Sequence, residues 1–263
     1  MAAIINYGWR LFGTGLSFAV FGLGGLILVV SVFPAISLFS RTEESRARRA
    51  RAMVSRSFRS FLWMLRGLGI FDFDVDPRCE EAFSAESGLI IAANHPTLID
   101  VVQLLARIEH GNCIVKRALW QNFFLGGVMR ATNYIPNDGS EDLIAMCVKV
   151  LKSGETLVIF PEATRTVAGR DMQLRRGAAR IALAASVPIQ LVHIRCDPPT
   201  LTKAEHWYEI PPRRPCLQMR VGDRLDIGAF ARKGEEPSMA SRRLTDLMYR
   251  MFMSKESNNN ERY

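Results

Sequence analysis

The sequence predicts an α/β fold in which a mixed sheet is covered by helices and is preceded by an N-terminal membrane helix and an amphipathic interfacial helix. Three observations lead to this prediction. Residues 11–40 carry no charged side chain, residues 41–70 hold eight Arg against two Glu, and beyond them short apolar runs alternate with helical patterns. We therefore divide the 263 residues into a membrane anchor (1–45), an Arg-rich amphipathic helix with its linker (46–76) and a globular domain (77–263).

The membrane anchor is predicted from its length and its lack of charge. As a helix, the segment from Leu11 to Ser40 would rise about 45 Å, which exceeds the ~30 Å hydrocarbon core of a bilayer. A cleaved signal peptide has a shorter apolar region of about 7–15 residues. Two alternatives stay open: a re-entrant hairpin bent at Pro34, and a buried core helix, which the five Gly of the segment disfavour.

The Arg-rich segment is predicted to form an amphipathic helix over residues 46–68. One face of this helix is apolar and consists of Val54, Phe58, Phe61, Leu62 and Leu65. We expect this face to lie on anionic lipid, and packing of the same face on the globular domain is the alternative. The Arg excess, set against the single Arg10 before the anchor, places the segment in the cytoplasm by the positive-inside rule.

The globular domain is predicted from alternating strand and helix patterns, which are typical of a sheet covered on both faces. Strands are expected at residues 88–92, 113–115, 134–135, 156–160, 188–194 and 217–221. Helices are expected at residues 98–109, 118–130, 141–151 and 177–185, and after Ser238. A Pro-rich loop occupies residues 196–215.

Charge and cysteine content exclude several classes of function. Of the net charge of +8, the Arg-rich segment contributes +6, so the globular domain is nearly neutral and nucleic acid is not expected as a partner. Five Cys without a CxxC pair predict neither a disulfide framework nor a cysteine zinc cluster. His110 and His206 have no partners at metal-ligand spacing, so no metal site is expected.

The first chemically informative motif is NHPTLID, residues 94–100, which follows a predicted strand and opens a predicted helix. His95 is suited to accept a proton near neutral pH, and Asp100 can fold back to hold one nitrogen of its ring. The chain has no Ser in a GxSxG elbow, so the nucleophile would be a hydroxyl of the substrate. A helix-capping Asp beside a structural His is the alternative reading.

The second motif is FPEATRT, residues 160–166, at the end of another predicted strand. Glu162 and Arg165, exposed on a loop, would bind an anionic, hydroxylated ligand. An ion pair within the loop explains the same two residues equally well.

In this order, the two motifs resemble those of the glycerolipid acyltransferase family, typified by 1-acylglycerol-3-phosphate O-acyltransferase. The resemblance spans about residues 88–195 and includes VPIQLV at 187–192. It implies that His95 is the general base and that Asp100 orients it. It also implies binding of the acceptor by the side chains of Glu162, Thr164, Arg165 and Lys116.

The resemblance further implies an acyl thioester of coenzyme A or acyl carrier protein as donor, and no other cofactor. For the thioester oxyanion, we expect donors among the backbone N–H groups just beyond His95. The chain departs from the family pattern where Asn137 replaces an Arg, Ala131 and Ala163 replace Gly, and Thr166 replaces Ser. The missing Arg leaves two acceptors open: 1-acylglycerol-3-phosphate, and a lipid or hydroxy-acyl acceptor without phosphate.

The sequence thus predicts a membrane-bound acyltransferase that acts on a lysophospholipid-type acceptor, with membrane lipids among its partners. The expected location is a bacterial inner membrane, with the catalytic domain on the cytoplasmic side. Two other functions remain as alternatives: a thioesterase, which would need no acceptor, and a membrane-surface binding protein that kept the fold without the activity.

Overall fold

One mixed sheet forms the centre of the computed structural model, which describes residues 2–84, 88–139, 142–166, 172–203, 205–230 and 235–260. Its strand order is β1-β7-β6-β2-β5-β3-β4, and neighbouring strands are parallel except for the antiparallel pair β6–β7. The predicted mixed α/β fold is therefore confirmed. The strands are β1 (Asp72–Val75), β2 (Leu89–Ala93), β3 (Asn112–Lys116), β4 (Ile135–Asn137), β5 (Thr156–Ile159), β6 (Ile189–Asp197) and β7 (Cys216–Leu225).

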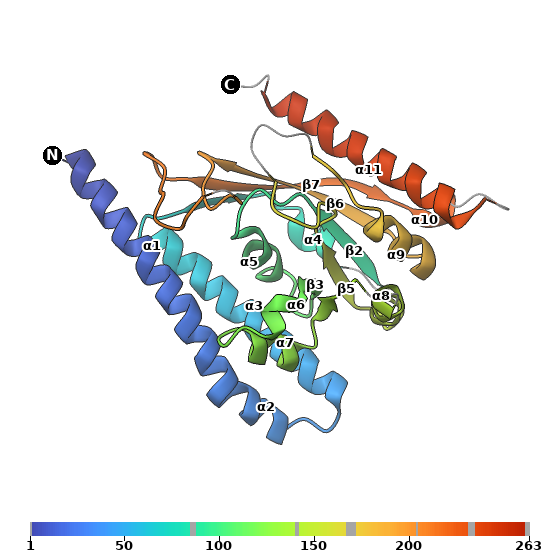
Figure 1. Cartoon of the computed structure of the whole chain (residues 1–263), viewed down its shortest axis with the longest axis horizontal. Coiled ribbons are helices and arrows are strands. Elements are labelled where there is room, and N and C mark those ends of the chain that lie inside the picture. Colours follow the sequence, from blue (N-terminus) through green and yellow to red (C-terminus); the bar gives the residue numbers. More distant parts are fainter. Residues whose placement is uncertain are drawn as a thin grey trace.

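Helices cover both faces of the sheet (Figure 1). One face packs on α3 (Glu43–Gly67), α5 (Asp100–Leu105) and α7 (Gly126–Thr132), and the other on α8 (Asp142–Lys152), α9 (Gly177–Ala185) and α11 (Pro237–Asn260). The central strand β2 explains this arrangement, because all five of its residues are apolar and buried. Ile91 faces the first layer and Ile90 the second, as expected for a parallel strand covered twice.

Some elements differ from the prediction. The helix expected at 118–130 is two helices, α6 (Arg117–Trp120) and α7, because the Asn122 side chain accepts hydrogen bonds from the backbone N–H groups of Phe124 and Leu125 and turns the chain. The short helices α4 (Cys79–Phe83) and α10 (Ile227–Phe230) were not predicted, and neither was β1. Position 141, the predicted start of α8, lies outside the described residues.

The N-terminal segment is one continuous helix made of α1 (Ala2–Ile27), a π-helical turn (Leu28–Val32) and α2 (Phe33–Leu38). The π turn lies just before Pro34, which lacks the N–H of a regular helix, and the helix continues through it. The re-entrant hairpin is therefore not formed. Within the part of the chain that the structure describes, residues 4–38 are the one helix long and apolar enough to cross a membrane, by length and composition alone.

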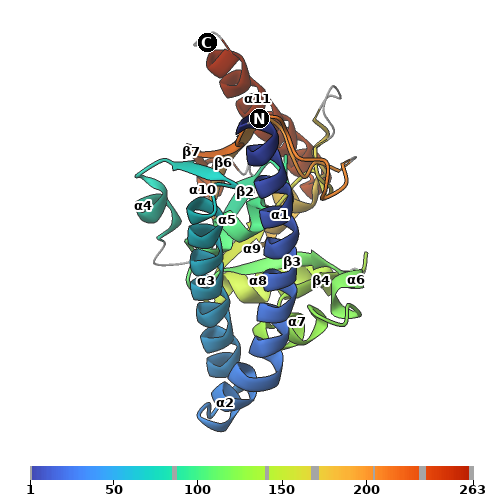
Figure 2. The same ribbon diagram turned by 90° about the vertical axis from the view of Figure 1, so that its left-hand side faces the viewer.

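One side of this N-terminal helix packs on the globular domain, so the helix does not stand apart from it. Figure 2 shows α1 lying alongside α3 in front of the sheet. The buried Arg10 donates hydrogen bonds of 2.8 Å to the carbonyl oxygens of Pro211 and Pro212. The ring of Phe21 lies 6.0 and 5.2 Å from the rings of Phe58 and Phe61, centroid to centroid.

The opposite face of the N-terminal helix is apolar and exposed. We call it the outer stripe; it follows the helical spacing of Phe12, Leu16, Val20, Leu23, Ile27 and Val30. Continuous exposed apolar surface of this kind marks a site of interaction with lipid or protein.

The predicted lipid-facing side of α3 requires a correction. Val54, Leu62 and Leu65 are buried in the core, and Phe58 and Phe61 meet α1, so the whole face is covered by protein. The expectation that this face lies on lipid is wrong, and the alternative of packing on the domain is confirmed. The segment predicted as a linker, up to residue 76, also forms part of the sheet, because its strand β1 pairs with β7 at the edge.

Candidate active site

The two sequence motifs meet at one edge of the sheet. Strands β2, β5 and β3 are parallel neighbours, so their carboxyl ends lie side by side. His95 follows β2, Glu162 follows β5, and Lys116 is the last residue of β3. The parallel order thus brings together residues that are more than sixty positions apart in the chain.

His95 and Asp100 form the pair that the sequence predicts. His95 Nδ1 lies 2.9 Å from Asp100 Oδ2, and the Asp100 side chain is fully buried while that of His95 is 15% exposed. Because the carboxylate accepts a hydrogen bond from the Nδ1–H group, the other ring nitrogen, Nε2, carries the free lone pair of the neutral imidazole. Nε2 has no hydrogen-bond partner within the described ranges. This ring nitrogen is therefore able to accept a proton.

Asp100 is itself held by Thr97. The backbone N–H of Thr97 donates to Oδ2 at 2.7 Å, and the Thr97 hydroxyl donates to Oδ1 at 2.8 Å. Burial raises the pKa of Asp100, while the hydrogen bonds from His95 and Thr97 act in the opposite direction by favouring the charged form. Thr97 was not singled out in the sequence, although it lies inside the first motif.

Phe160 fixes the plane of the His95 ring from the neighbouring strand. The two rings stack with centroids 4.2 Å apart and an angle of 28° between their planes. Phe160 lies directly after β5, so the second motif supports the first through this contact as well.

Glu162 connects the two motifs through the backbone of His95. Its Oε1 accepts a hydrogen bond from the His95 N–H at 3.0 Å, and both of its carboxylate oxygens accept from the Thr166 hydroxyl. The Thr166 N–H in turn donates to the His95 carbonyl at 2.8 Å. Glu162 is buried, and this burial raises its pKa, against the effect of the His95 and Thr166 hydrogen bonds. In this structure Glu162 positions the loop of His95; the predicted contact with an acceptor stays a prediction.

Arg165 reaches a different loop. Its Nη1 donates to the carbonyl oxygens of Leu201 and Thr202, at 2.8 Å each. The guanidinium therefore holds the loop between β6 and β7 against the second motif, and Thr164 is half-buried beside it. No sequence signal marked Leu201, because it lies in the Pro-rich loop far from either motif.

Lys116 lies on the same edge of the sheet, but outside the hydrogen-bonded group around His95. Its side chain is exposed, and β5 separates its strand from β2. In the sheet register Lys116 is paired with Asn137, the residue that replaces the family's Arg. The neighbouring Arg117 forms an ion pair with Asp138 at 2.9 Å.

The backbone N–H groups just beyond His95 are already engaged, which corrects the expected oxyanion site. Thr97 N–H binds Asp100, Leu98 N–H binds the Leu201 carbonyl at 3.2 Å, and Ile99 N–H binds the Thr97 hydroxyl at 3.0 Å. Separately, among the described residues no three His, Cys, Asp or Glu side chains come close enough together to hold a metal ion.

Comparisons with known proteins agree with this geometry. A family model described as acyltransferase matches residues 74–195, which include both motifs. The 1-acyl-sn-glycerol-3-phosphate acyltransferase of Bacillus subtilis is 33% identical over 115 residues, or 42% of this chain and 57% of that protein. The enzyme of the same name from Helicobacter pylori is 32% identical over 108 residues, or 38% and 46% of the two chains. Over residues 74–195, the chain is therefore similar to acyltransferases of this kind.

A solved structure shares the fold of this chain. The 1-acyl-sn-glycerophosphate (LPA) acyltransferase PlsC from Thermotoga maritima matches 94% of this chain and 96% of its own, with a TM-score of 0.66 and 19% identity. At that identity the likeness shows a shared fold alone. In sequence, the chain spans about half the length of the curated relatives named above.

Replacing Ala163 by Gly should stabilise the protein. Ala163 has a φ of +59°, in the left-handed region, which costs a residue with a Cβ about 1–2 kcal/mol. After the larger chain entropy of Gly in the unfolded state is subtracted, we expect Ala163→Gly to raise the free energy of unfolding by about 1 kcal/mol. Denaturant unfolding in detergent measures it. The control Ala118→Gly, in the helix α6, should lower the free energy of unfolding instead. A lower free energy of unfolding in both variants would contradict the assignment of backbone strain to Ala163.

Glu162→Gln should change how stability depends on pH. Burial raises the folded-state pKa of Glu162 above its unfolded value of 4.5, so the folded protein binds the proton more tightly. This contribution to stability is therefore present at acid pH and is lost as the pH rises from about 4.5 through the folded-state pKa. In thermal unfolding, the melting temperature of the Gln variant should decline less steeply with pH over that window than that of the wild type. The exposed control Glu80→Gln should follow the wild type, and identical slopes for all three proteins would contradict the prediction.

Proposed function

We propose that this protein is a membrane-associated O-acyltransferase that moves an acyl chain from a thioester to a hydroxyl of a lysophospholipid-type acceptor, of the 1-acylglycerol-3-phosphate kind. The observation that carries the proposal is the hydrogen bond between His95 and the buried Asp100, which leaves Nε2 free at the edge where the second motif arrives. The names of the Bacillus and Helicobacter relatives supply the acceptor class.

The proposed mechanism needs no nucleophile from the protein. His95 Nε2 takes the proton of the acceptor hydroxyl as its oxygen attacks the thioester carbonyl carbon. The new C–O bond forms and the C–S bond breaks, and the departing sulfur receives the proton back from the imidazolium. Asp100 keeps the ring in the required tautomer and stabilises its positive charge, since its carboxylate is fixed by Thr97 on the other side.

Lys116 is the proposed contact for an acceptor phosphate. Its side chain is exposed at the active edge, and its neighbour in the register is the neutral Asn137, so Lys116 supplies the positive charge at that point. Asn137 is also the observation that favours the second candidate, an acceptor without phosphate. The donor, a thioester of coenzyme A or acyl carrier protein, is common to both.

Membrane association is proposed from the outer stripe of the N-terminal helix. The stripe is uncharged and exposed, and a single-chain lysolipid acceptor resides in the bilayer. Four exposed Arg, Arg41 just before α3 and Arg46, Arg48 and Arg49 near its start, would face anionic headgroups, which supports the cytoplasmic side.

The decisive experiment follows thioester consumption by the purified protein with and without 1-acylglycerol-3-phosphate. We expect acceptor-dependent acyl transfer, and a loss of about 10²–10⁴-fold in His95→Ala because general-base catalysis contributes that much. His110→Asn is the matched control and should retain activity. Thioester hydrolysis without acceptor would instead indicate a thioesterase, and a wild type that is inert with this acceptor and with a lysolipid that lacks phosphate would indicate a binding protein.

Lys116→Met should distinguish the two acceptor classes. If Lys116 binds phosphate, its loss should raise the KM for 1-acylglycerol-3-phosphate by about tenfold, the effect of one charge-assisted contact, with little change for a lysolipid that lacks phosphate. Lys152→Met, at the end of α8 and exposed, is the control. An equal rise in KM for both acceptors in Lys116→Met would show that Lys116 does not bind the phosphate.

A further inference from the structure

Two pairs of exposed aromatic side chains lie on loops far apart in the sequence. Phe123 and Phe124, between α6 and α7, are 81% and 42% exposed, and Trp207 and Tyr208, between β6 and β7, are 47% and 50% exposed. Neither pair belongs to a sequence motif or to the site around His95. Large apolar side chains exposed in adjacent pairs are costly in water and point to a partner.

Both aromatic pairs border the same helix, α1. A Cβ added to Gly15 would lie 3.2 Å from the Trp207 ring, and the Trp207 ring lies 6.1 Å from that of Phe18. Further along α1, a Cβ on Gly25 would lie 3.4 Å from the Phe124 carbonyl oxygen. Gly residues thus let the two loops approach α1 closely, and the aromatic pairs lie beside the helix that carries the outer stripe.

The chemistry of this surface fits a lipid interface. Trp and Tyr combine an apolar ring with one polar group, and they are enriched where membranes meet water. At the far end of the same N-terminal helix, Leu38 and Phe39 are 83% and 77% exposed, and Arg49 donates to the Phe39 carbonyl at 2.7 Å. Exposed arginine beside exposed apolar side chains complements anionic headgroups above acyl chains.

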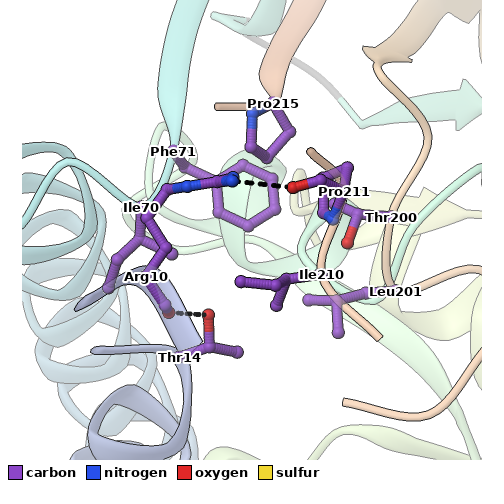
Figure 3. Close-up of a pocket in the computed structure, with 9 residues that line it drawn as sticks. All are labelled: Arg10, Thr14, Ile70, Phe71, Thr200, Leu201, Ile210, Pro211 and Pro215. Atoms are coloured by element: carbon purple, nitrogen blue, oxygen red, sulfur yellow. Dashed lines mark hydrogen bonds between the residues drawn. The ribbon is translucent and has the colours of Figure 1, made fainter. Parts of the chain in front are cut away.

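The loop of Trp207 is fixed to the active site at one end and to α1 at the other. At the first end the Leu201 carbonyl accepts from Arg165 of the second motif and from the N–H of Leu98 of the first motif. At the second end Arg10 of α1 holds the Pro211 carbonyl. Figure 3 shows this second end, where Arg10 and Leu201 line the same small cavity.

We propose that loops 121–125 and 205–209 are lipid contacts that dock together with the outer stripe onto a bilayer and set the position of His95 relative to its surface. The inference rests on the proposed membrane association and extends it from the helix to two specific loops. Because the 205–209 loop is held to both α1 and the active-site loops, its insertion presents the site to an acceptor that lies in the bilayer.

The test uses the full chain with vesicles of equal parts phosphatidylglycerol and phosphatidylcholine. The two double variants are Trp207→Ala with Tyr208→Ala, and Phe123→Ala with Phe124→Ala. Each should bind vesicles about tenfold more weakly, because each loses the burial of two large side chains. Acyl transfer to a vesicle-embedded lysolipid should fall in proportion, whereas transfer to a monomeric short-chain acceptor should stay within about twofold of wild type. Met239→Ala, exposed on α11 across the sheet, is the control and should bind as wild type does.

The outcomes separate this inference from the proposed function. Double variants that bind vesicles as the wild type does would overturn the lipid contact. An equal loss on the monomeric acceptor would also overturn it, since the loops would then serve the site or the fold itself. Loss of self-association with unchanged vesicle binding would assign the surface to a second copy. If the wild type neither binds vesicles nor transfers acyl groups, it is the proposed function that fails.

Discussion

The carboxylate of Glu162 is the contact on which the site depends, because it connects two loops that reach the same edge from adjacent parallel strands. It accepts from the backbone of His95 and from the Thr166 hydroxyl, while the Thr166 N–H returns a bond to the His95 carbonyl. The backbone that carries the imidazole is thereby fixed from β5, independently of the Asp100 contact that fixes the ring. A buried carboxylate tolerates its loss of hydration only with such a set of donors.

The N-terminal helix and α3 belong to the domain as much as the sheet does. The side of α1 that faces the protein is lined by Gly and by small hydroxyl residues such as Thr14 and Ser17, which are buried and bond to carbonyls of their own helix. This lets bulky groups such as Ile70 and Trp207 come close to its backbone. Large apolar side chains such as Phe12 and Leu23 face outward, whereas Phe21 packs inward on α3, so α1 combines close packing on one side with the apolar outer stripe on the other.

Much of the fold and the centre of the site were predictable, because the signals were local. The buried strand β2 and the five-residue spacing of His95 and Asp100 lie in short stretches of sequence, and both were predicted correctly. Side-chain partners across the chain were not predictable from spacing. The apolar face of α3 looks the same whether it meets lipid or Phe21, and Arg165 is the same residue whether it binds a ligand or the Leu201 carbonyl. In both cases tertiary contacts, and not the local sequence, determine which partner the side chains meet.

The buried Arg10 has a practical consequence for handling the protein. The guanidinium of Arg10 donates to the carbonyls of Pro211 and Pro212, so deleting the N-terminal helix would remove two hydrogen bonds from the loop between β6 and β7. The same loop contacts Arg165 of the second motif, and the deletion would also uncover Phe58 and Phe61. A detergent-free form is therefore better sought by exchanging the outward residues of that helix for Glu, Lys and Gln while its inward side is kept. Such a redesign changes the solvent that the helix meets and leaves its packing intact.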